Sequence, residues 1–258
     1  MYLFNDITLL VTHYNRPASL ERLLRSFEEM GCRFHEIIVS DDASAPSNLE
    51  VIRTLADNYS FRVITAARNM GLGHNINKGQ RAVHTPYTLY VQEDFIPTAL
   101  FPEKLQQAFQ MMDQDKDLDL ARFYAYFRYP YLRPAGDGFS EMIFRPWYRG
   151  YKKFYLYSDH PHLRRSTFPD KFGSYKEGLR SDKTEYEMMM NFLKKKGKGL
   201  FFEEYQNLFI QKNSGDEPST VHREFWRTST KFPISQIRNI YRHLKFNYDL
   251  FLRLKIQN

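Results

Sequence analysis

The chain has 258 residues, 42% hydrophobic and 16% aromatic, so it can bury a sizeable core as one large domain, with or without appendages. It contains no run of eighteen apolar residues, which excludes a transmembrane helix, and its N-terminus has neither the basic region nor the cleavage site of a signal peptide. The net charge of +7 suits an anionic partner, but acids outnumber bases in residues 1–120, so the positive excess lies in the second half.

Apolar strands alternate with amphipathic helices over the first ninety or so residues. Strands are predicted at 7–14, 35–40, 61–67 and 87–92, and helices at 18–30, 47–59 and 73–84. This order is typical of an α/β fold, in which helices cover both faces of a parallel sheet and the crossovers are right-handed. Ligands of such open sheets bind beyond the carboxyl ends of the strands.

Polar residues gather at the ends of these four strands. The clusters read THYNR (12–16), SDDAS (40–44), RNMGLGHN (68–75) and QED (92–94). Because the carboxyl ends of parallel strands share one edge, we expect all four clusters on one rim of the sheet. An aromatic residue, arginines, glycines and paired acids on one rim indicate a nucleotide site with a metal ion.

Individual residues of these clusters have candidate roles in binding a nucleotide. Tyr14 offers a face for base stacking, and Asp41 can accept a hydrogen bond from a uracil imide N–H. Arg16 and Arg68 are candidates to meet the base or the phosphates. The alternatives are a core tyrosine, a solvated arginine and, for Asp42, a helix N-cap.

Glu93 and Asp94 stand side by side after a buried strand, where two desolvated carboxylates would repel each other. A divalent ion on Asp94 that bridged two phosphates would neutralise both the acids and a leaving diphosphate. Oxygen ligands suit Mg²⁺ or Mn²⁺. The alternative is a solvated acidic turn.

Four segments resemble, in order, the motifs of glycosyltransferase family 2, whose members are inverting nucleotide-sugar enzymes with a GT-A fold. They are TLLVTHYNRPASLERLLRSF, EIIVSDDAS, NMGLGHNINKG and YTLYVQEDF, and the resemblance covers roughly residues 5–100. It implies a Rossmann-like, mostly parallel sheet flanked by helices, and a UDP-sugar as the donor. By this resemblance Thr12 and Tyr14 contact the nucleoside, Asp41 binds the base and Asp94 holds the metal. Glu93 replaces an aspartate of the family, which leaves its contact with the nucleotide open.

The second half of the chain carries the candidates for the acceptor side. A helix is predicted at 102–114, and the aromatic, basic runs 119–134 and 142–165 are predicted to be strand-like. Trp147 and Tyr148 are candidates for contact with an acceptor sugar. The alternative is a pair of core strands with solvated arginines.

The proton acceptor is expected in a predicted helix at 181–197, SDKTEYEMMMNFLKKKG. The family often has Glu-Asp-x-Glu-Leu here, and placing its Glu-Leu on Glu187 and Met188 implies that Glu185 is the general base. Asp182 is the main rival, and Asp159 is the next acid to test. His222, in the polar loop 210–224, stands where related enzymes place an additional metal ligand.

The tail, residues 232–255, predicts one long helix with apolar residues at helical spacing. Residues 231–258 contain six Lys or Arg and one acid, Asp249. A basic amphipathic helix can lie on an anionic membrane, or it can pack on the domain with its basic side in water.

These features predict three regions: a nucleotide-sugar-binding half (1–100), an acceptor-binding and catalytic half of the same GT-A domain (101–230) and a basic helical tail (231–258). The resemblance implies hexosyl or N-acetylhexosaminyl transfer to a glycan or lipid-linked acceptor, in polysaccharide biosynthesis. A nucleotidyltransferase would need a glycine- and lysine-rich first turn, which is missing. A non-catalytic basic module for membrane or nucleic acid leaves the rim acids unexplained, so no nucleic acid is expected. The single cysteine, Cys32, is compatible with a cytoplasmic location, with the inner face of the cell membrane as a peripheral site.

Overall fold

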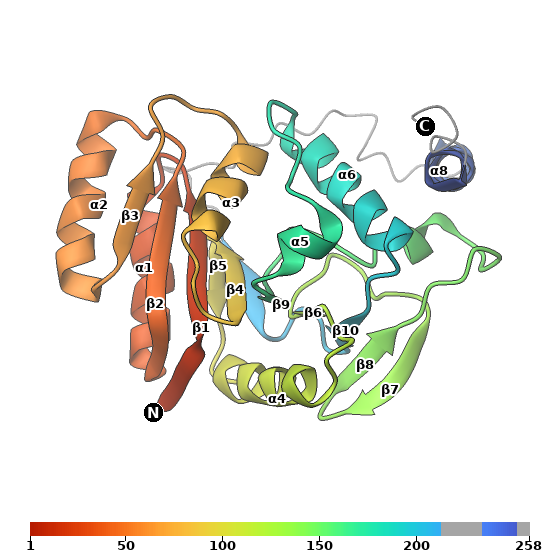
Figure 1. Cartoon of the computed structure of the whole chain (residues 1–258), viewed down its shortest axis with the longest axis horizontal. Helices are drawn as coiled ribbons and strands as arrows, with labels where there is room; N and C mark the ends of the chain where they lie inside the picture. The colour runs from red at the N-terminus through yellow and green to blue at the C-terminus, as the bar shows by residue number, and fades with distance from the viewer. Residues whose placement is uncertain (213–233, 252–258) are drawn as a thin grey trace.

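The computed structural model describes residues 1–212 and 234–251 (Figure 1). The first half contains β1 (Tyr2–His13), α1 (Pro17–Glu29), β2 (Cys32–Asp41), α2 (Pro46–Tyr59), β3 (Arg62–Thr65), α3 (Leu72–Arg81) and β4 (Tyr87–Gln92). The second half contains β5 (Phe95–Pro97), α4 (Phe101–Gln114), β6 (Leu120–Arg122), β7 (Leu132–Gly136), β8 (Phe139–Met142), the 3₁₀ helix η1 (Tyr151–Phe154), β9 (His162–Arg165), α5 (Phe168–Phe172), α6 (Ser181–Lys194), β10 (Gly199–Phe202), β11 (Phe209–Gln211) and α8 (Ile234–Phe251).

The described strands form a nine-stranded sheet in the order β3-β2-β1-β4-β9-β6-β10-β8-β7, and β5 pairs separately with β11. Strands β1 to β4 run parallel to one another, and β6 runs parallel to β10, whereas β9 is antiparallel to both β4 and β6. The predicted α/β fold with a mostly parallel first half is therefore confirmed.

Two hydrophobic cores fill the two faces of the sheet, because successive strand residues point to opposite sides. In β1, Leu9 and Val11 pack against α1, α2 and α4 on one face, and Leu10 packs with α3 and α6 on the other. Figure 1 shows α1 and α2 together on one side of β1 and β2, with α3 on the opposite side. The cores hold the strand ends in fixed positions, which is what a site at those ends requires.

Helix α3 lies unusually close to the sheet at Gly79. A Cβ atom at this position would lie 2.4 Å from Leu10 Cδ1 and 2.9 Å from Ser40 Cβ, so only glycine fits without displacing β1 or β2. This close approach brings α3 and its basic side chains next to the rim.

The two aromatic runs of the second half differ from the strands that the sequence predicts. Only residues 120–122 of the first run and 162–165 of the second join the sheet's centre, and 132–136 form an edge strand. The remainder is loops and the short helix η1. The physical reason is that the aromatic side chains pack on one another across these loops, as Tyr131 does on Tyr148 and Phe127 on Tyr155, so the loops are held without a continuous strand ladder.

The predicted tail helix is present as α8, which contacts η1 and α6 (Figure 1). Phe246 and Leu250 are buried in this contact. None of the described helices has both the length and the apolar character needed to cross a membrane.

Candidate active site

The ends of β1, β2 and β4 meet at one rim of the sheet. In the strand registers Thr12 lies beside both Ser40 and Gln92, and His13 lies beside Asp41. The side chains that follow these strands are thereby brought to the same rim, as the sequence predicts.

Asp41 is fully buried at the end of β2. His13 Nδ1 lies 2.8 Å from Oδ1, the Ser44 amide donates to Oδ2 at 3.0 Å, and Thr65 Oγ1 donates to Oδ2 at 2.8 Å. Burial raises the pKa of Asp41, but these hydrogen bonds outweigh it and hold the pKa well below its ordinary value. Asp41 therefore ties three loops together from inside. The carboxylate is covered in this structure, and the expected contact of Asp41 with a uracil base stays a prediction.

The neighbouring Asp42 orders the loop after β3. Its two oxygens accept hydrogen bonds from the Met70 amide at 2.9 Å and the Gly71 amide at 2.8 Å. Gly71 has φ +83°, a left-handed conformation that favours glycine. The N-cap alternative for Asp42 does not hold, since α2 is preceded by Ala45 without a side-chain cap. Asp42 instead fixes the loop that carries Arg68.

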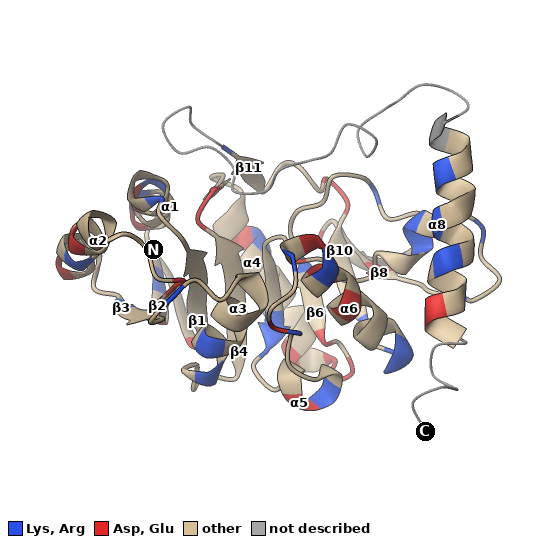
Figure 2. Cartoon of the chain, turned by 90° about the horizontal axis from the view of Figure 1, so that it is seen from above, with Lys and Arg blue, Asp and Glu red and all other residues tan. Residues whose placement is uncertain are grey.

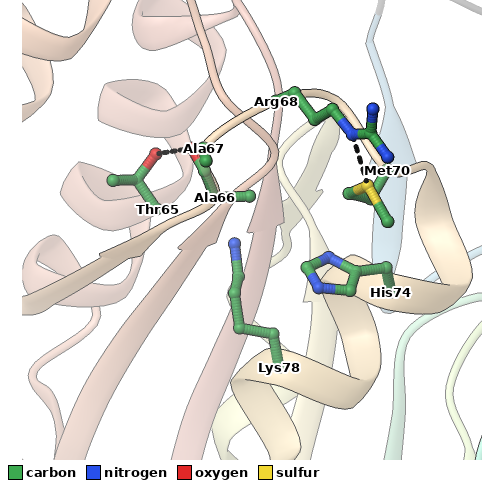
Figure 3. Close-up of a pocket in the computed structure, with 7 residues that line it drawn as sticks. All are labelled: Thr65, Ala66, Ala67, Arg68, Met70, His74 and Lys78. Carbon is green, nitrogen blue, oxygen red and sulfur yellow. Dashed lines mark hydrogen bonds between the residues drawn. The ribbon is translucent and has the colours of Figure 1, made fainter.

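A pocket of about 520 Å³ opens between the end of β3 and helix α3 (Figure 3). It is lined by Thr65, Ala66, Ala67, Arg68, Met70, His74 and Lys78. Lys78 Nζ donates to the Asp41 carbonyl oxygen, and burial lowers the pKa of Lys78. Two cations and an imidazole suit a flat, polar, anionic ligand. Arg68 is predicted from the sequence, whereas His74 and Lys78 are not, although their separation by four residues places them on one face of a helix.

Tyr14 and Thr12, the other two residues predicted to contact the nucleoside, differ in their exposure. Tyr14 is half-buried directly after β1. Thr12 is buried, and its Oγ1 lies 3.0 Å from the Tyr90 hydroxyl. The Thr12 side chain therefore links β1 to β4. Tyr14, at the end of β1, stays the predicted stacking partner of a base.

Arg16 lies between the paired acids that follow β4. Its Nη1 is 3.4 Å from Glu93 Oε1 and 3.8 Å from Asp94 Oδ2. Burial, together with the neighbouring charge of Asp94, raises the pKa of Glu93 to about 7. His13 and Arg16 act in the opposite direction and lower it. Part of the positive charge that two adjacent carboxylates require is thus supplied by the protein itself.

Asp94 has the features of a metal ligand. Its Oδ2 accepts a hydrogen bond from Gln211 Nε2 at 2.9 Å, whereas its Oδ1 is buried and has no hydrogen-bond partner. A lone carboxylate oxygen of this kind fits a divalent ion that takes most of its other ligands from substrate phosphates. Within residues 1–212 and 234–251 no group of three His, Cys, Asp or Glu is assembled. His222, the other predicted ligand, lies outside the described residues.

Two further acidic residues, Asp159 and Glu185, lie close together next to the end of β4. The Asp159 amide donates to Glu185 Oε1 at 3.3 Å, which places the loop before β9 against the first turn of α6. Burial raises the pKa of both groups, and the proximity of Glu185 contributes to raising that of Asp159 to about 8. Gln92 Nε2 donates to the Asp159 carbonyl oxygen at 3.4 Å, so this acid pair adjoins the end of β4.

The rival acids of the same helix have other partners. Asp182 lies 3.5 Å from Arg180 and is about one-third exposed, and Glu187 forms an ion pair with Lys176 at 3.0 Å. Of the three acids of this helix, Glu185 is the one bonded to the Asp159 amide, and Asp159 is the next acid to test by sequence.

Comparison with known proteins identifies relatives for much of this chain. The family described as Glycosyl transferase family 2 matches residues 8–177. A cholesterol galactosyltransferase of Borreliella burgdorferi is 26% identical over 121 residues, 47% of this chain and 33% of that protein. An uncharacterized glycosyltransferase of Haemophilus influenzae is 25% identical over 113 residues, 44% of this chain and 36% of that protein. The matches thus span about a third of each curated relative.

Solved structures share the fold at low sequence identity. TarS 1–349 of S. aureus superposes with a TM-score of 0.60 at 14% identity, covering 96% of this chain and 73% of that one. The same protein in complex with UDP-GlcNAc gives a TM-score of 0.57 at 15% identity, covering 98% of this chain and 77% of that one. A mannosyltransferase of Pyrobaculum calidifontis in complex with GDP-Man and Mn²⁺ gives 0.55 at 12% identity, with 93% and 63% coverage.

Proposed function

The chain belongs to glycosyl transferase family 2, and on that basis we propose that it transfers a sugar from a nucleoside-diphosphate sugar to an acceptor hydroxyl, with inversion at the anomeric carbon. The order of groups along the rim supports this proposal most directly. The basic pocket lies at β3, Arg16 follows β1, the acids Glu93 and Asp94 follow β4, and Asp159 precedes β9.

The spacing of these groups suits the donor. Three strand separations lie between β3 and β4, about 14 Å in total, which matches the extent of a nucleoside diphosphate. We place the base in the pocket beside Arg68 and Lys78 and against Tyr14. The diphosphate then extends toward Arg16 and Asp94, and the sugar toward the acid pair. UDP is the nucleotide that we propose, since UDP-GlcNAc occupies the structurally similar TarS.

Asp94, with Glu93 beside it, would hold Mn²⁺ or Mg²⁺, and His222 remains the proposal for a further ligand. Such an ion supplies charge neutralisation for the departing diphosphate. The Arg16 guanidinium lies next to the same two acids and would also stabilise the negative charge of the departing diphosphate.

Glu185 is the residue that we propose as general base. The acceptor oxygen forms a bond to the anomeric carbon, the bond from that carbon to the phosphate oxygen breaks, and its electron pair leaves with the diphosphate. Glu185 takes the proton of the acceptor hydroxyl during this step. Burial raises the pKa of Glu185, and a carboxylate with a raised pKa is a stronger base than an ordinary one, which suits this task.

The acceptor is expected over the second half of the sheet. Trp147 is 75% exposed, and Tyr148 packs on Tyr131 beside it. Exposed aromatic rings suit the faces of sugar rings, so we propose a saccharide or lipid-linked acceptor in polysaccharide biosynthesis and a hexosyl or N-acetylhexosaminyl group as the sugar.

Helix α8 supports a peripheral membrane location. Its large apolar side chains Ile237, Ile240, Tyr241, Leu244, Tyr248 and Phe251 are all exposed, and their spacing places them on one face. Arg238, Arg242 and Lys245 flank that face, and Figure 2 shows basic residues along α8. Apolar and basic side chains together match an anionic bilayer, so we propose that the cytoplasmic face of the cell membrane covers this surface.

A titration calorimetry experiment tests the donor site. Wild-type protein should bind UDP with Mn²⁺ and bind it much more weakly in EDTA. Asp94→Asn should lose the metal-dependent part of the affinity and the transferase activity while keeping its fold, and Asp170→Asn, an exposed acid far from the rim, is the matched control. Near-normal transferase activity of Asp94→Asn in EDTA would contradict the proposal. A panel of UDP-, GDP- and dTDP-sugars then identifies the donor.

A further inference from the structure

A chain of hydrogen bonds runs through the core to the acid pair. Arg164 Nη1 donates to the Tyr175 hydroxyl at 2.6 Å, the Tyr175 and Tyr157 hydroxyls are hydrogen-bonded, and the Tyr157 hydroxyl donates to Asp159 Oδ1 at 2.6 Å. All four side chains are buried, and Arg164 also donates to Gln80 Oε1 at 2.8 Å. The fold thus places an extended polar network behind one carboxyl group.

The direction of this chain follows once Asp159 Oδ1 is taken as the acceptor of the Tyr157 hydroxyl. Arg164 can only donate, and the Tyr157 proton points to Asp159, so Tyr175 must donate to Tyr157. Every link therefore delivers a proton toward Asp159 Oδ1, which acts as an acceptor. A proton carried by Asp159 can then lie only on its other oxygen, Oδ2.

Asp159 Oδ2 is buried and has no hydrogen-bond partner. An ionised carboxylate oxygen in that position would carry charge in a low-dielectric environment beside a second acid, which is costly. A neutral carboxyl group avoids this cost, and the nearby Glu185 carboxylate, which accepts from the Asp159 amide, then carries the charge of the pair.

We propose that Asp159 is a positioning residue that remains a neutral carboxylic acid in the resting enzyme, so that Asp159 and Glu185 together carry one negative charge and Glu185 alone accepts the proton of the acceptor. The inference rests on the proposed function of Glu185. During transfer the Asp159 proton stays in place, Glu185 gains the acceptor proton, and the pair returns one proton to solvent afterwards. The Arg164–Tyr175–Tyr157 chain determines which oxygen of Asp159 carries its proton.

The charged and titratable groups around the pair agree with a single negative charge. Besides those named, Arg122, Tyr90, Tyr155 and Asp182 interact electrostatically with one or other member of the pair. Burial is the largest influence on both acids and disfavours a second charge.

Carboxyl-carbon NMR of the ¹³C-labelled full-length protein tests the protonation state without any substrate. The Asp159 carboxyl signal, assigned by its disappearance in Asp159→Asn, should change with a midpoint near pH 8. Tyr157→Phe should move this midpoint to higher pH, because it removes a hydrogen bond to the ionised form. A midpoint below pH 5 overturns the proposal. Because no donor is needed, a protein that transfers no sugar but titrates near pH 8 refutes the proposed function alone.

Kinetics of the same variants test the role of the proton. Asp159→Asn mimics the neutral acid, so kcat at pH 7 should stay within about tenfold of wild type, and the change in the pH profile near pH 8 should disappear. Asp182→Asn, in the first turn of α6, should have a much smaller effect on both. A loss of about 10²-fold or more at pH 7 in Asp159→Asn, with Glu185→Gln still active, would identify Asp159 itself as the base and overturn the proposal.

Discussion

Adjacent aspartates perform different tasks at this rim. Asp41 holds the strand ends together from inside, and Asp42 fixes the loop that forms the pocket wall. The identical side chains differ only in which loop amides and hydroxyls reach them. Neither contact is predictable from the sequence, because the partners lie on loops distant in the chain.

Asp41→Asn should therefore act mainly on stability. The amide cannot accept hydrogen bonds on both sides, so donors from His13, Ser44 and Thr65 lose a charged partner inside the protein. Urea denaturation should show a loss of roughly 3 kcal/mol in the free energy of unfolding. Asp42→Ala should instead reduce UDP affinity more than stability. An Asp41→Asn protein that is fully stable but does not bind UDP would restore the role expected from the family motif.

Glu185→Gln should remove the base and little else. Glutamine keeps the size of the side chain and its carbonyl acceptor for the Asp159 amide. We expect metal-dependent UDP affinity to persist and kcat to fall at least about 10²-fold. Asp182→Asn and Glu187→Gln, whose acids are paired with Arg180 and Lys176, serve as matched controls with smaller effects. Similar, mild losses in all three variants would place the base outside this helix.

The acid pair also predicts a pH dependence of stability. An unfolded aspartate releases its proton near pH 3.9, whereas Asp159 holds its proton to about pH 8 in the folded protein. Between these values the folded state binds more protons, so the free energy of unfolding should fall as pH rises, by up to about 1.4 kcal/mol per pH unit. Comparing urea denaturation of wild type and Asp159→Asn from pH 4 to 8 isolates this contribution. Parallel curves for the two proteins would show that Asp159 is ionised throughout.

At the scale of elements, α8 offers a test within a single helix. Leu244 is 64% exposed on the outer face, and Leu250 is 5% exposed against the body of the protein. Leu244→Ser should weaken binding to vesicles containing anionic lipid and leave the melting temperature unchanged. Leu250→Ser should lower the melting temperature, because it leaves an underfilled apolar contact. Unchanged vesicle binding in Leu244→Ser, together with an altered oligomeric state, would assign the outer face to a second copy of the chain.

The elements of the first half were predictable from sequence, and those of the second half only in part. Strand 87–92 and the helices near 18–30 and 47–59 match β4, α1 and α2 closely, because each has its own period and a proline at its start. The runs 119–134 and 142–165 carry aromatic residues throughout and so lack a period that separates a strand from a packed loop.

The candidate site was predictable to the extent that strand ends define it. Glu93 and Asp94 were found because they follow an apolar strand. Arg16 between these acids, Lys78 in the pocket and Asp159 beside Glu185 depend on contacts between residues distant in the chain or on different elements. The buried Arg164 chain was not predictable, since nothing local distinguishes Arg164 from the other basic residues around it.

At the scale of the whole molecule, helix α8 is bonded to α6 at the residue that follows Glu185, the proposed base. Tyr186, the neighbour of Glu185, donates a hydrogen bond to Asp249 of α8, and Lys245 pairs with the same carboxylate. A surface that binds α8 and an acceptor that binds at Glu185 therefore act on one helix turn from its two sides. Thermodynamic reciprocity then applies: if the bilayer strengthens acceptor binding by some factor, the acceptor must strengthen adhesion to the bilayer by the same factor. Such an enzyme would stay bound longest to regions of the membrane where the acceptor is abundant. Its distribution over the membrane would then depend on the local concentration of the acceptor.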